Sequence, residues 1–88
     1  MFYVYYIESL KSSFRYIGLT SDLKRRLEEH NSCQNKSTKA YAPYRVIFYE
    51  AYVDIDDAKR REKYLKTTAG REALRKMLKC YNQSVGKY

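Results

Sequence analysis

Glu62 is a carboxylate on a helix face that is otherwise apolar. It lies four residues after Ala58 and three before Leu65, so the three side chains share one side of the predicted helix. Burying an ionised carboxylate without a partner is strongly unfavourable, so we expect Glu62 at a cation, a hydrogen-bond donor or the edge of a cleft. Its oxygens suit Mg²⁺ or Mn²⁺, hard ions that keep several of their waters. The alternative is an ion pair with a neighbouring cation, namely Arg61, Lys63 or Lys66.

A second pair of chemically useful side chains lies on an earlier predicted helix. Arg26 precedes His30 by four residues, so the two are neighbours on the helix surface. A guanidinium binds phosphate oxygens in pairs at any working pH, and an imidazole exchanges a proton near neutral pH. Taken alone, both residues also have ordinary interpretations: His30 as a core side chain, and Arg26 as the partner of Glu28 or Glu29.

The chain is strongly basic. Eighteen Lys and Arg against ten Asp and Glu give its 88 residues a net charge of +8. Such an excess favours a polyanionic partner, with nucleic acid first and an anionic membrane surface second. Contacts to backbone phosphates would give affinity and salt dependence rather than sequence choice, and for each residue a merely solvated surface is the alternative. The cations that we expect to make these contacts are Lys24, Arg25, Lys36, Lys39 and Arg45.

Cysteine usage and hydropathy indicate the compartment. Cys33 and Cys80 are too few for a disulfide scaffold, and we expect two free thiols. The N-terminal residues lack the basic and apolar regions of a signal peptide, and no apolar run approaches membrane-spanning length. These features predict a cytoplasmic protein with no membrane partner.

The first half of the chain predicts a hairpin and a helix. Residues 2 to 8 and 14 to 19 are rich in aromatic and β-branched side chains, which is typical of strands, and the turn between them is short. Gly18 inside the second strand predicts a bulge or the close approach of another group. A helix follows from an N-cap at Ser21 to about His30.

The second half predicts an irregular loop, one strand and two helices. The loop covers residues 32 to 44 and the strand residues 45 to 53. A helix capped by Asp54 continues to about Lys66, and a last helix covers residues 70 to 81. Tyr41 and Tyr44 of the loop either stack on unpaired bases or pack beside the loop's proline.

The order ββαβαα predicts an α+β fold with a small, three-stranded, antiparallel sheet flanked by helices. We expect a single domain over residues 1 to 82, followed by a short polar tail over residues 83 to 88.

Several of these residues recur in one known arrangement: Tyr5 in the first strand, the triplet Tyr16-Ile17-Gly18 in the second, Arg26 and His30 on the next helix, and Glu62 on a later one. This pattern resembles the GIY-YIG nuclease family, which is named after two strand triplets. The second triplet is intact here, whereas the first reads Tyr3-Val4-Tyr5 and keeps only its tyrosine. The resemblance covers residues 2 to 79, and is nearest to the small single-domain bacterial members. The N-terminal nuclease module of the excision-repair incision enzyme is similar too.

The resemblance implies hydrolysis of phosphodiester bonds in DNA with one divalent metal ion, Mg²⁺ or Mn²⁺. It implies Glu62 as the metal ligand and Arg26 as the donor to the scissile phosphate. Both Tyr5 and Tyr16 would line the site, and Tyr5 is the favoured base for the attacking water because His30 is its expected helper. The sequence leaves open which tyrosine acts.

Two positions depart from the incision-enzyme pattern. Leu19 stands where that branch has a lysine, and the segment Glu72-Ala73-Leu74 lacks its asparagine. The first hypothesis is a structure-tolerant DNA endonuclease of repair or DNA processing, acting on branched or single-stranded DNA, alone or with a partner protein. The alternative is a nucleic-acid-binding module of the same fold with weak or no catalysis. An interaction domain with an incidental basic surface fits the retained residues least.

Overall fold

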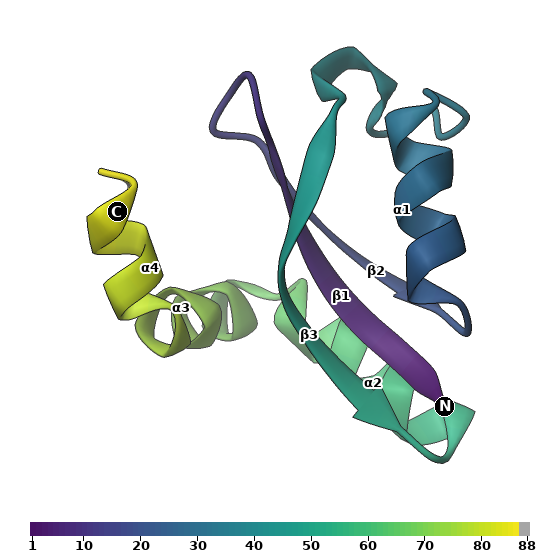
Figure 1. Cartoon of the computed structure of the whole chain (residues 1–88). Coiled ribbons are helices and arrows are strands. Elements are labelled where there is room, and N and C mark those ends of the chain that lie inside the picture. The colour runs from purple at the N-terminus through teal and green to yellow at the C-terminus, as the bar shows by residue number, and fades with distance from the viewer. Residues whose placement is uncertain (87–88) are drawn as a thin grey trace.

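The computed structural model, described over residues 1 to 86, contains a three-stranded antiparallel sheet. The strands are β1 (Phe2–Ser9), β2 (Arg15–Thr20) and β3 (Tyr44–Tyr52), and their order in the sheet is β2-β1-β3. Helix α1 lies on one face of the sheet, and α2 crosses the other (Figure 1). The predicted α+β class and the small antiparallel sheet flanked by helices are confirmed.

The central strand β1 divides the apolar interior into two layers. Successive side chains of a strand point to opposite faces, and β1 is buried on both. Val4 packs with Ala58, Leu65 and Leu74 on the side of α2 and α3 (Thr68–Met77). On the other side, Tyr5 and its cluster lie under α1 (Leu23–Asn31). A site built on β1 and β2 can therefore draw side chains from helices on both faces.

Helix α1 begins one residue later than the sequence predicts. The N-cap is Asp22 rather than Ser21, because the Asp22 carboxylate accepts a hydrogen bond from the backbone N–H of Arg25 at 3.1 Å. Leu23 and Leu27 pack against the sheet as expected. His30, on the same stripe, is completely buried.

The predicted last helix is in fact two helices. Helix α2 (Ile55–Leu65) is capped by Asp54 as expected, but α3 begins at Thr68, two residues before Gly70. A Cβ at Gly70 would overlap the carbonyl of Tyr64 at the end of α2, so this glycine permits a close helix crossing instead of starting the helix. The helix ends at Met77, and a short α4 (Lys79–Ser84) follows.

Helix α4 is attached to the body of the protein. The hydroxyl of Tyr81 donates a hydrogen bond to the buried carboxylate of Glu8 in β1, and Asn82 is itself buried. The expected boundary between residues 82 and 83 thus lies inside α4, and the last two residues of the expected tail, 87 and 88, lie outside the described residues. The loop before β3 includes a short 3₁₀ helix, η1 (Lys39–Tyr41).

Candidate active site

Tyr5, His30 and Thr38 form a buried hydrogen-bonded chain between β1 and α1. The hydroxyl of Tyr5 lies 2.8 Å from Nε2 of His30, and Nδ1 of His30 lies 2.7 Å from the hydroxyl oxygen of Thr38. All three side chains are almost fully buried, with Tyr5 only 2% exposed. The structure thus joins Tyr5 to His30, as the sequence analysis expects, and adds Thr38 as the residue that holds the far side of the imidazole.

Gly18 explains how Tyr5 reaches this position. Tyr5 pairs with Gly18 across β1 and β2. A Cβ at Gly18 would overlap the hydroxyl and ring of Tyr5, so only glycine leaves room for the phenol to lie over β2. The close approach that Gly18 predicts is therefore made by the side chain of Tyr5.

Burial determines the protonation states of Tyr5 and His30 in this hydrogen-bonded chain. Burial raises the pKa of Tyr5 to about 12, against the opposing effect of the nearby Arg26 charge. Burial, together with the same arginine, lowers the pKa of His30, so its imidazole is neutral at pH 7. We assign the tautomer from these partners: the protonated Tyr5 donates to Nε2, and Nδ1 carries the proton that is donated to Thr38.

Arg26 lies beside the Tyr5 hydroxyl on the open side of this chain. Its Nη1 donates to Glu29 at 3.1 Å, and its side chain is 39% exposed. The Nε–H group is buried and makes no hydrogen bond of normal geometry with any described residue. A buried unsatisfied donor is costly. The guanidinium of Arg26 thus combines one buried donor that lacks a partner with an exposed part that can bind an incoming anion.

Tyr16 on β2 and Glu62 on α2 are the remaining two candidate catalytic residues. Tyr16 on β2 lies edge-on to His30, with ring centroids 5.4 Å apart. The carboxylate of Glu62 on α2 lies near enough to contribute to the raised pKa of Tyr5. Lys66 connects the two residues, since its Nζ lies 3.1 Å from Oε2 of Glu62 and 5.8 Å from the Tyr16 ring centroid. The five predicted catalytic residues therefore lie together, and Lys66 is a cation that the sequence analysis gave only as a possible ion-pair partner.

Glu62 is the carboxylate with which the site could hold a metal ion. Among the described residues there is no cluster of three or more His, Cys, Asp or Glu side chains. The side chain of Glu62 is 24% exposed, and its contact with Lys66 engages only Oε2. This donor set fits a hard divalent ion that takes its remaining ligands from water and phosphate oxygens. It does not fit a closed protein cage.

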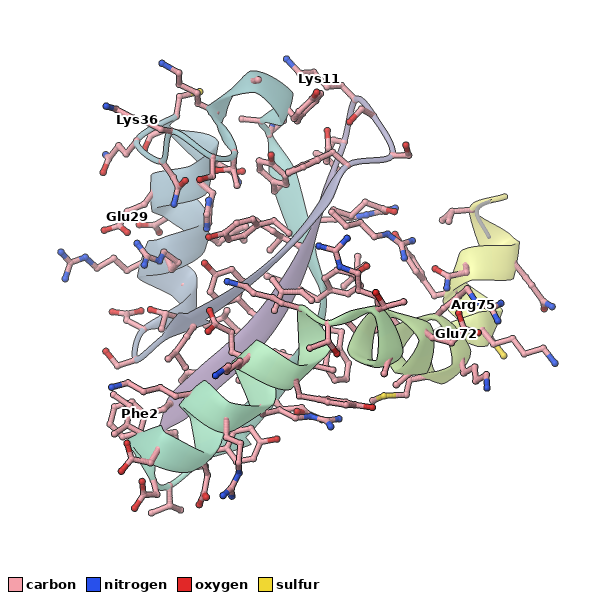
Figure 2. All side chains as sticks on the ribbon, turned by 180° about the vertical axis from the view of Figure 1, so that it is seen from behind. Phe2, Lys11, Glu29, Lys36, Glu72 and Arg75 are labelled. Carbon is pink, nitrogen blue, oxygen red and sulfur yellow. The ribbon has the colours of Figure 1, made fainter. Side chains whose placement is uncertain are left out.

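The cations predicted to bind phosphate are dispersed. Lys24 and Arg25 are exposed on α1, where Arg25 pairs with Glu29. Figure 2 shows Lys36 beyond the far end of α1, pointing outward. Arg45 lies on the opposite sheet edge and is engaged by Glu8 and the Tyr81 hydroxyl.

The two loop tyrosines differ from each other. Tyr44 is buried and donates its hydroxyl proton to the carbonyl oxygen of Thr38, so it is a core residue and is not placed for base stacking. Tyr41 stacks on Phe14 with ring centroids 4.7 Å apart, and stays partly exposed.

Comparison with known proteins adds evidence from sequence similarity. Residues 1–77 match the model of the GIY-YIG catalytic domain. A UPF0213 protein of Streptococcus pneumoniae is 37% identical over 65 residues, which cover 73% of this chain and 65% of the relative. A UPF0213 protein of Clostridium perfringens is 32% identical over 62 residues, or 69% and 67% of the two chains.

The matched region thus spans about two thirds of these two relatives. In a UPF0213 protein of Staphylococcus aureus it is longer, with 32% identity over 71 residues, which cover 80% of this chain and 87% of the relative. No solved structure gives a significant match. Within the described residues, no helix has the length and apolar character needed to cross a membrane. The match over nearly the whole chain and the shared sequence with small bacterial proteins show that the chain belongs to the GIY-YIG family.

Proposed function

We propose that this protein is a metal-dependent DNA endonuclease. The observation that supports the proposal most directly is the hydrogen bond from Tyr5 to a buried, neutral His30, made beside Arg26 and Glu62. A phenol, a proton acceptor, a phosphate-binding fork and a carboxylate are the groups that hydrolysis of a phosphodiester requires.

The raised pKa of Tyr5 favours a relay over a free phenolate. At a pKa of about 12, Tyr5 is protonated at neutral pH and is a poor base by itself. Its proton is donated to Nε2 of His30, so a lone pair of its oxygen is available to a water. As the water loses a proton to the Tyr5 oxygen, the Tyr5 proton moves to His30. The resulting imidazolium is held by Thr38, and the hydroxide attacks phosphorus. The 3′ oxygen leaves with the electron pair of the broken P–O bond and takes a proton from solvent water.

Arg26 would bind the scissile phosphate. A planar guanidinium donates to two phosphate oxygens and stays charged throughout the reaction. Binding an anionic phosphate there also offsets the positive charge that lowers the pKa of His30. Substrate binding would therefore make His30 a better proton acceptor at the moment when it is needed.

Glu62 is the residue that would hold Mg²⁺ or Mn²⁺. When bound, such an ion stabilises negative charge on the phosphate and on the leaving oxygen. The chain contributes the Glu62 carboxylate at the edge of the site, and Lys66 is its counter-ion.

A second candidate function is a nucleic-acid-binding module with weak or no catalysis. The observation that favours it is the ion pair between Glu62 and Lys66, which is the ordinary interpretation of Glu62 that the sequence allows. Leu19 in place of the lysine of the incision-enzyme branch points in the same direction.

For the substrate, we propose a DNA recognised by its structure rather than by its base sequence. A domain of this size has little surface for reading base edges in a groove. Repair or processing of branched or single-stranded DNA in the cytoplasm, alone or with a partner protein, suits such an enzyme.

The test is a cleavage assay with supercoiled plasmid, single strands and a branched junction, each with Mg²⁺, Mn²⁺ or EDTA. Glu62→Gln keeps the size of the side chain but removes its charge, and Glu28→Gln makes the same change at an exposed position of α1. We expect metal-dependent cleavage that is lost in Glu62→Gln and kept in Glu28→Gln.

Cleavage that survives in Glu62→Gln would contradict the placement of the metal ion. Salt-dependent binding of DNA without cleavage under any of these conditions would support the binding module instead.

A further inference from the structure

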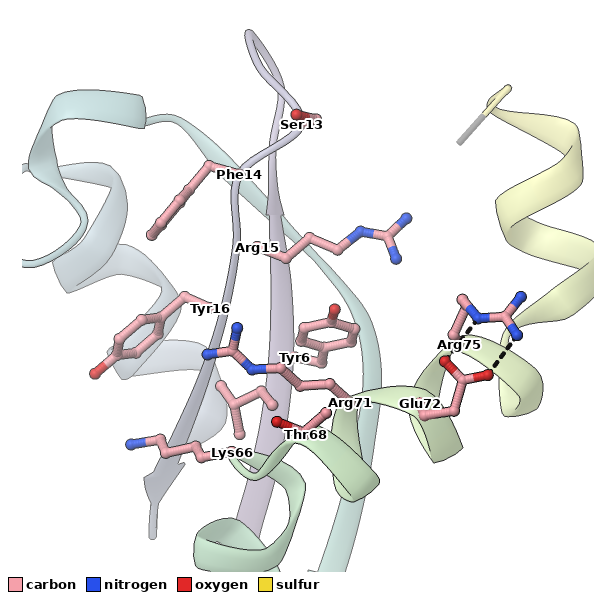
Figure 3. Close-up of a pocket in the computed structure, with 11 residues that line it drawn as sticks. Tyr6, Ser13, Phe14, Arg15, Tyr16, Lys66, Thr68, Arg71, Glu72 and Arg75 are labelled. Atoms are coloured by element: carbon pink, nitrogen blue, oxygen red, sulfur yellow. Dashed lines mark hydrogen bonds and ion pairs between the residues drawn. The ribbon is translucent and has the colours of Figure 1, made fainter. Parts of the chain in front are cut away.

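A groove of about 940 Å³ lies beside the candidate active site, between β2 and the start of α3 (Figure 3). Tyr16 and Lys66 line this groove and also belong to the site. Whatever occupies the groove is therefore continuous with whatever reacts at Tyr5. None of the five residues predicted from sequence to bind phosphate lines it.

The groove carries an excess of positive charge. Its lining contains four cations, Arg15, Lys66, Arg71 and Arg75, and one carboxylate, Glu72. Glu72 is already neutralised by Arg75 in a bidentate contact, and this pair lies at the outer end of the groove in Figure 3. Arg15 and Lys66 are paired with carboxylates outside the lining, so the charge that is open to an anionic ligand is that of Arg71.

Arg71 is the cation that is best placed for such a ligand. Its side chain extends from α3 across the groove toward Tyr16 in Figure 3. The guanidinium of Arg71 makes no ion pair or hydrogen bond with any residue in the described part of the chain, whereas Arg15 is paired with Glu8 and Lys66 with Glu62. A guanidinium with all its donors open, aimed into a groove, is a ready site for a phosphate.

The groove is lined by aromatic rings as well as by charge. Tyr6 on β1 and Tyr16 on β2 are half-buried where they line it, whereas Phe14, just before β2, stacks on Tyr41. Cationic side chains beside aromatic rings are the combination with which proteins hold single strands, because unpaired bases stack on rings while the backbone phosphates bind the cations. A duplex offers no free base faces to such a surface.

We propose that this groove binds single-stranded DNA adjoining the scissile phosphate, with Arg71 holding a backbone phosphate. The inference rests on the nuclease function proposed above, because the groove and the site share Tyr16 and Lys66. Pockets of roughly 300–1,000 Å³ hold ligands of a few tens of atoms. The volume of the groove therefore suits one or two nucleotides of a single strand.

The test measures binding without cleavage. Fluorescence anisotropy with a short labelled oligothymidylate, in EDTA and over a range of salt concentrations, compares the wild type with Arg71→Glu, Arg71→Lys and Arg60→Glu. Arg60 is exposed on α2 outside the groove. Arg60→Glu makes the same change in net charge as Arg71→Glu and therefore serves as the control. We expect Arg71→Glu to weaken binding about tenfold or more. The slope of log K against log salt should become shallower by about 0.7, the value for one phosphate on a single strand. Arg71→Lys should keep most of the affinity.

Two results would overturn the proposal. Equal losses in Arg71→Glu and Arg60→Glu would mean that only net charge matters. If Arg71→Glu lost as much affinity for a duplex as for the oligothymidylate, the groove would not select single strands. Because the assay contains EDTA, neither result depends on catalysis, and the cleavage assay with Glu62→Gln separately decides the nuclease function. Unchanged melting temperatures of the variants confirm that they are folded.

Discussion

The hydroxyl of Tyr5 and Nε2 of His30 are 2.8 Å apart, although 25 residues separate them in the chain. The contact joins the central strand to the last turn of α1, and both partners are almost completely buried. A tyrosine that is buried with a hydrogen-bonded histidine can pass on a proton without ever becoming a free phenolate. The following predictions test this relationship and the packing that creates it.

Tyr5→Phe should abolish the proposed relay while keeping the fold. The substitution removes only the hydroxyl, so the ring still fills the space above Gly18. General-base catalysis contributes roughly 10²–10⁴-fold, and we expect kcat to fall by a factor in that range. Tyr49→Phe is the matched control, because Tyr49 is 55% exposed on β3 outside the site. Equal kcat values for the two variants would assign the base role to another residue, with Tyr16 as the next candidate.

Activity should decline on the acid side because His30 must be neutral to accept the proton. Its pKa is lowered by burial and by Arg26, so the decline should begin below the ordinary histidine value of about 6.5.

The stability of the protein should also depend on the protonation of His30, because its pKa in the folded state lies below that in the unfolded state. The contribution of this pKa difference to the free energy of unfolding is therefore complete above the unfolded pKa of His30, and it is lost as pH falls through the folded pKa. Melting temperature measured against pH should show this loss in the wild type and not in His30→Gln.

The sequence predicts the strands and the close approach at Gly18 better than it predicts which side chains contact one another. Alternating aromatic and β-branched residues identify β1 and β2, and Gly18 correctly indicates a close approach. Thr38 has no such signal, because it lies in an irregular loop and acts only through a tertiary hydrogen bond. For Glu62, the sequence offers three nearby cations as possible partners, and the folded structure selects Lys66, which lies one helical turn further on.

The missed helix boundary has a similar cause. Glycine lowers helix propensity, so the sequence favours Gly70 as the beginning of the last helix. In the structure, Gly70 lies in the first turn of α3 because the contact with the end of α2 leaves no room for a side chain. Tertiary packing thus overrides local propensity here. The same crossing brings Arg71 to the groove, which explains why the spacing of basic residues gave no indication of it.

Gly18→Ala should impair both stability and catalysis. The added Cβ would overlap the Tyr5 hydroxyl, so the ring must move or the strands must separate. Overpacking of this kind costs about 1–3 kcal/mol, and a displacement of about 1 Å at a reacting group reduces the rate roughly 10²-fold. Gly70→Ala is the contrast, since it overlaps the backbone of α2 away from Tyr5. Denaturant unfolding should show a loss in both variants, whereas kcat per folded molecule should fall only in Gly18→Ala.

Glu8→Gln should destabilise the protein without changing the chemistry of the site. The Glu8 side chain is 2% exposed and pairs with Arg15, which is 5% exposed, at 2.9 Å. It also accepts the hydrogen bond that attaches α4 through Tyr81. Removing one partner of a buried ion pair leaves the other charge uncompensated, which costs about 3–5 kcal/mol. Asp57→Asn, which disrupts an exposed pair with Arg60, should change stability by no more than about 0.5 kcal/mol. Chemical denaturation measures both variants, and a Glu8→Gln protein as stable as Asp57→Asn would show that Arg15 can reach solvent or another acceptor.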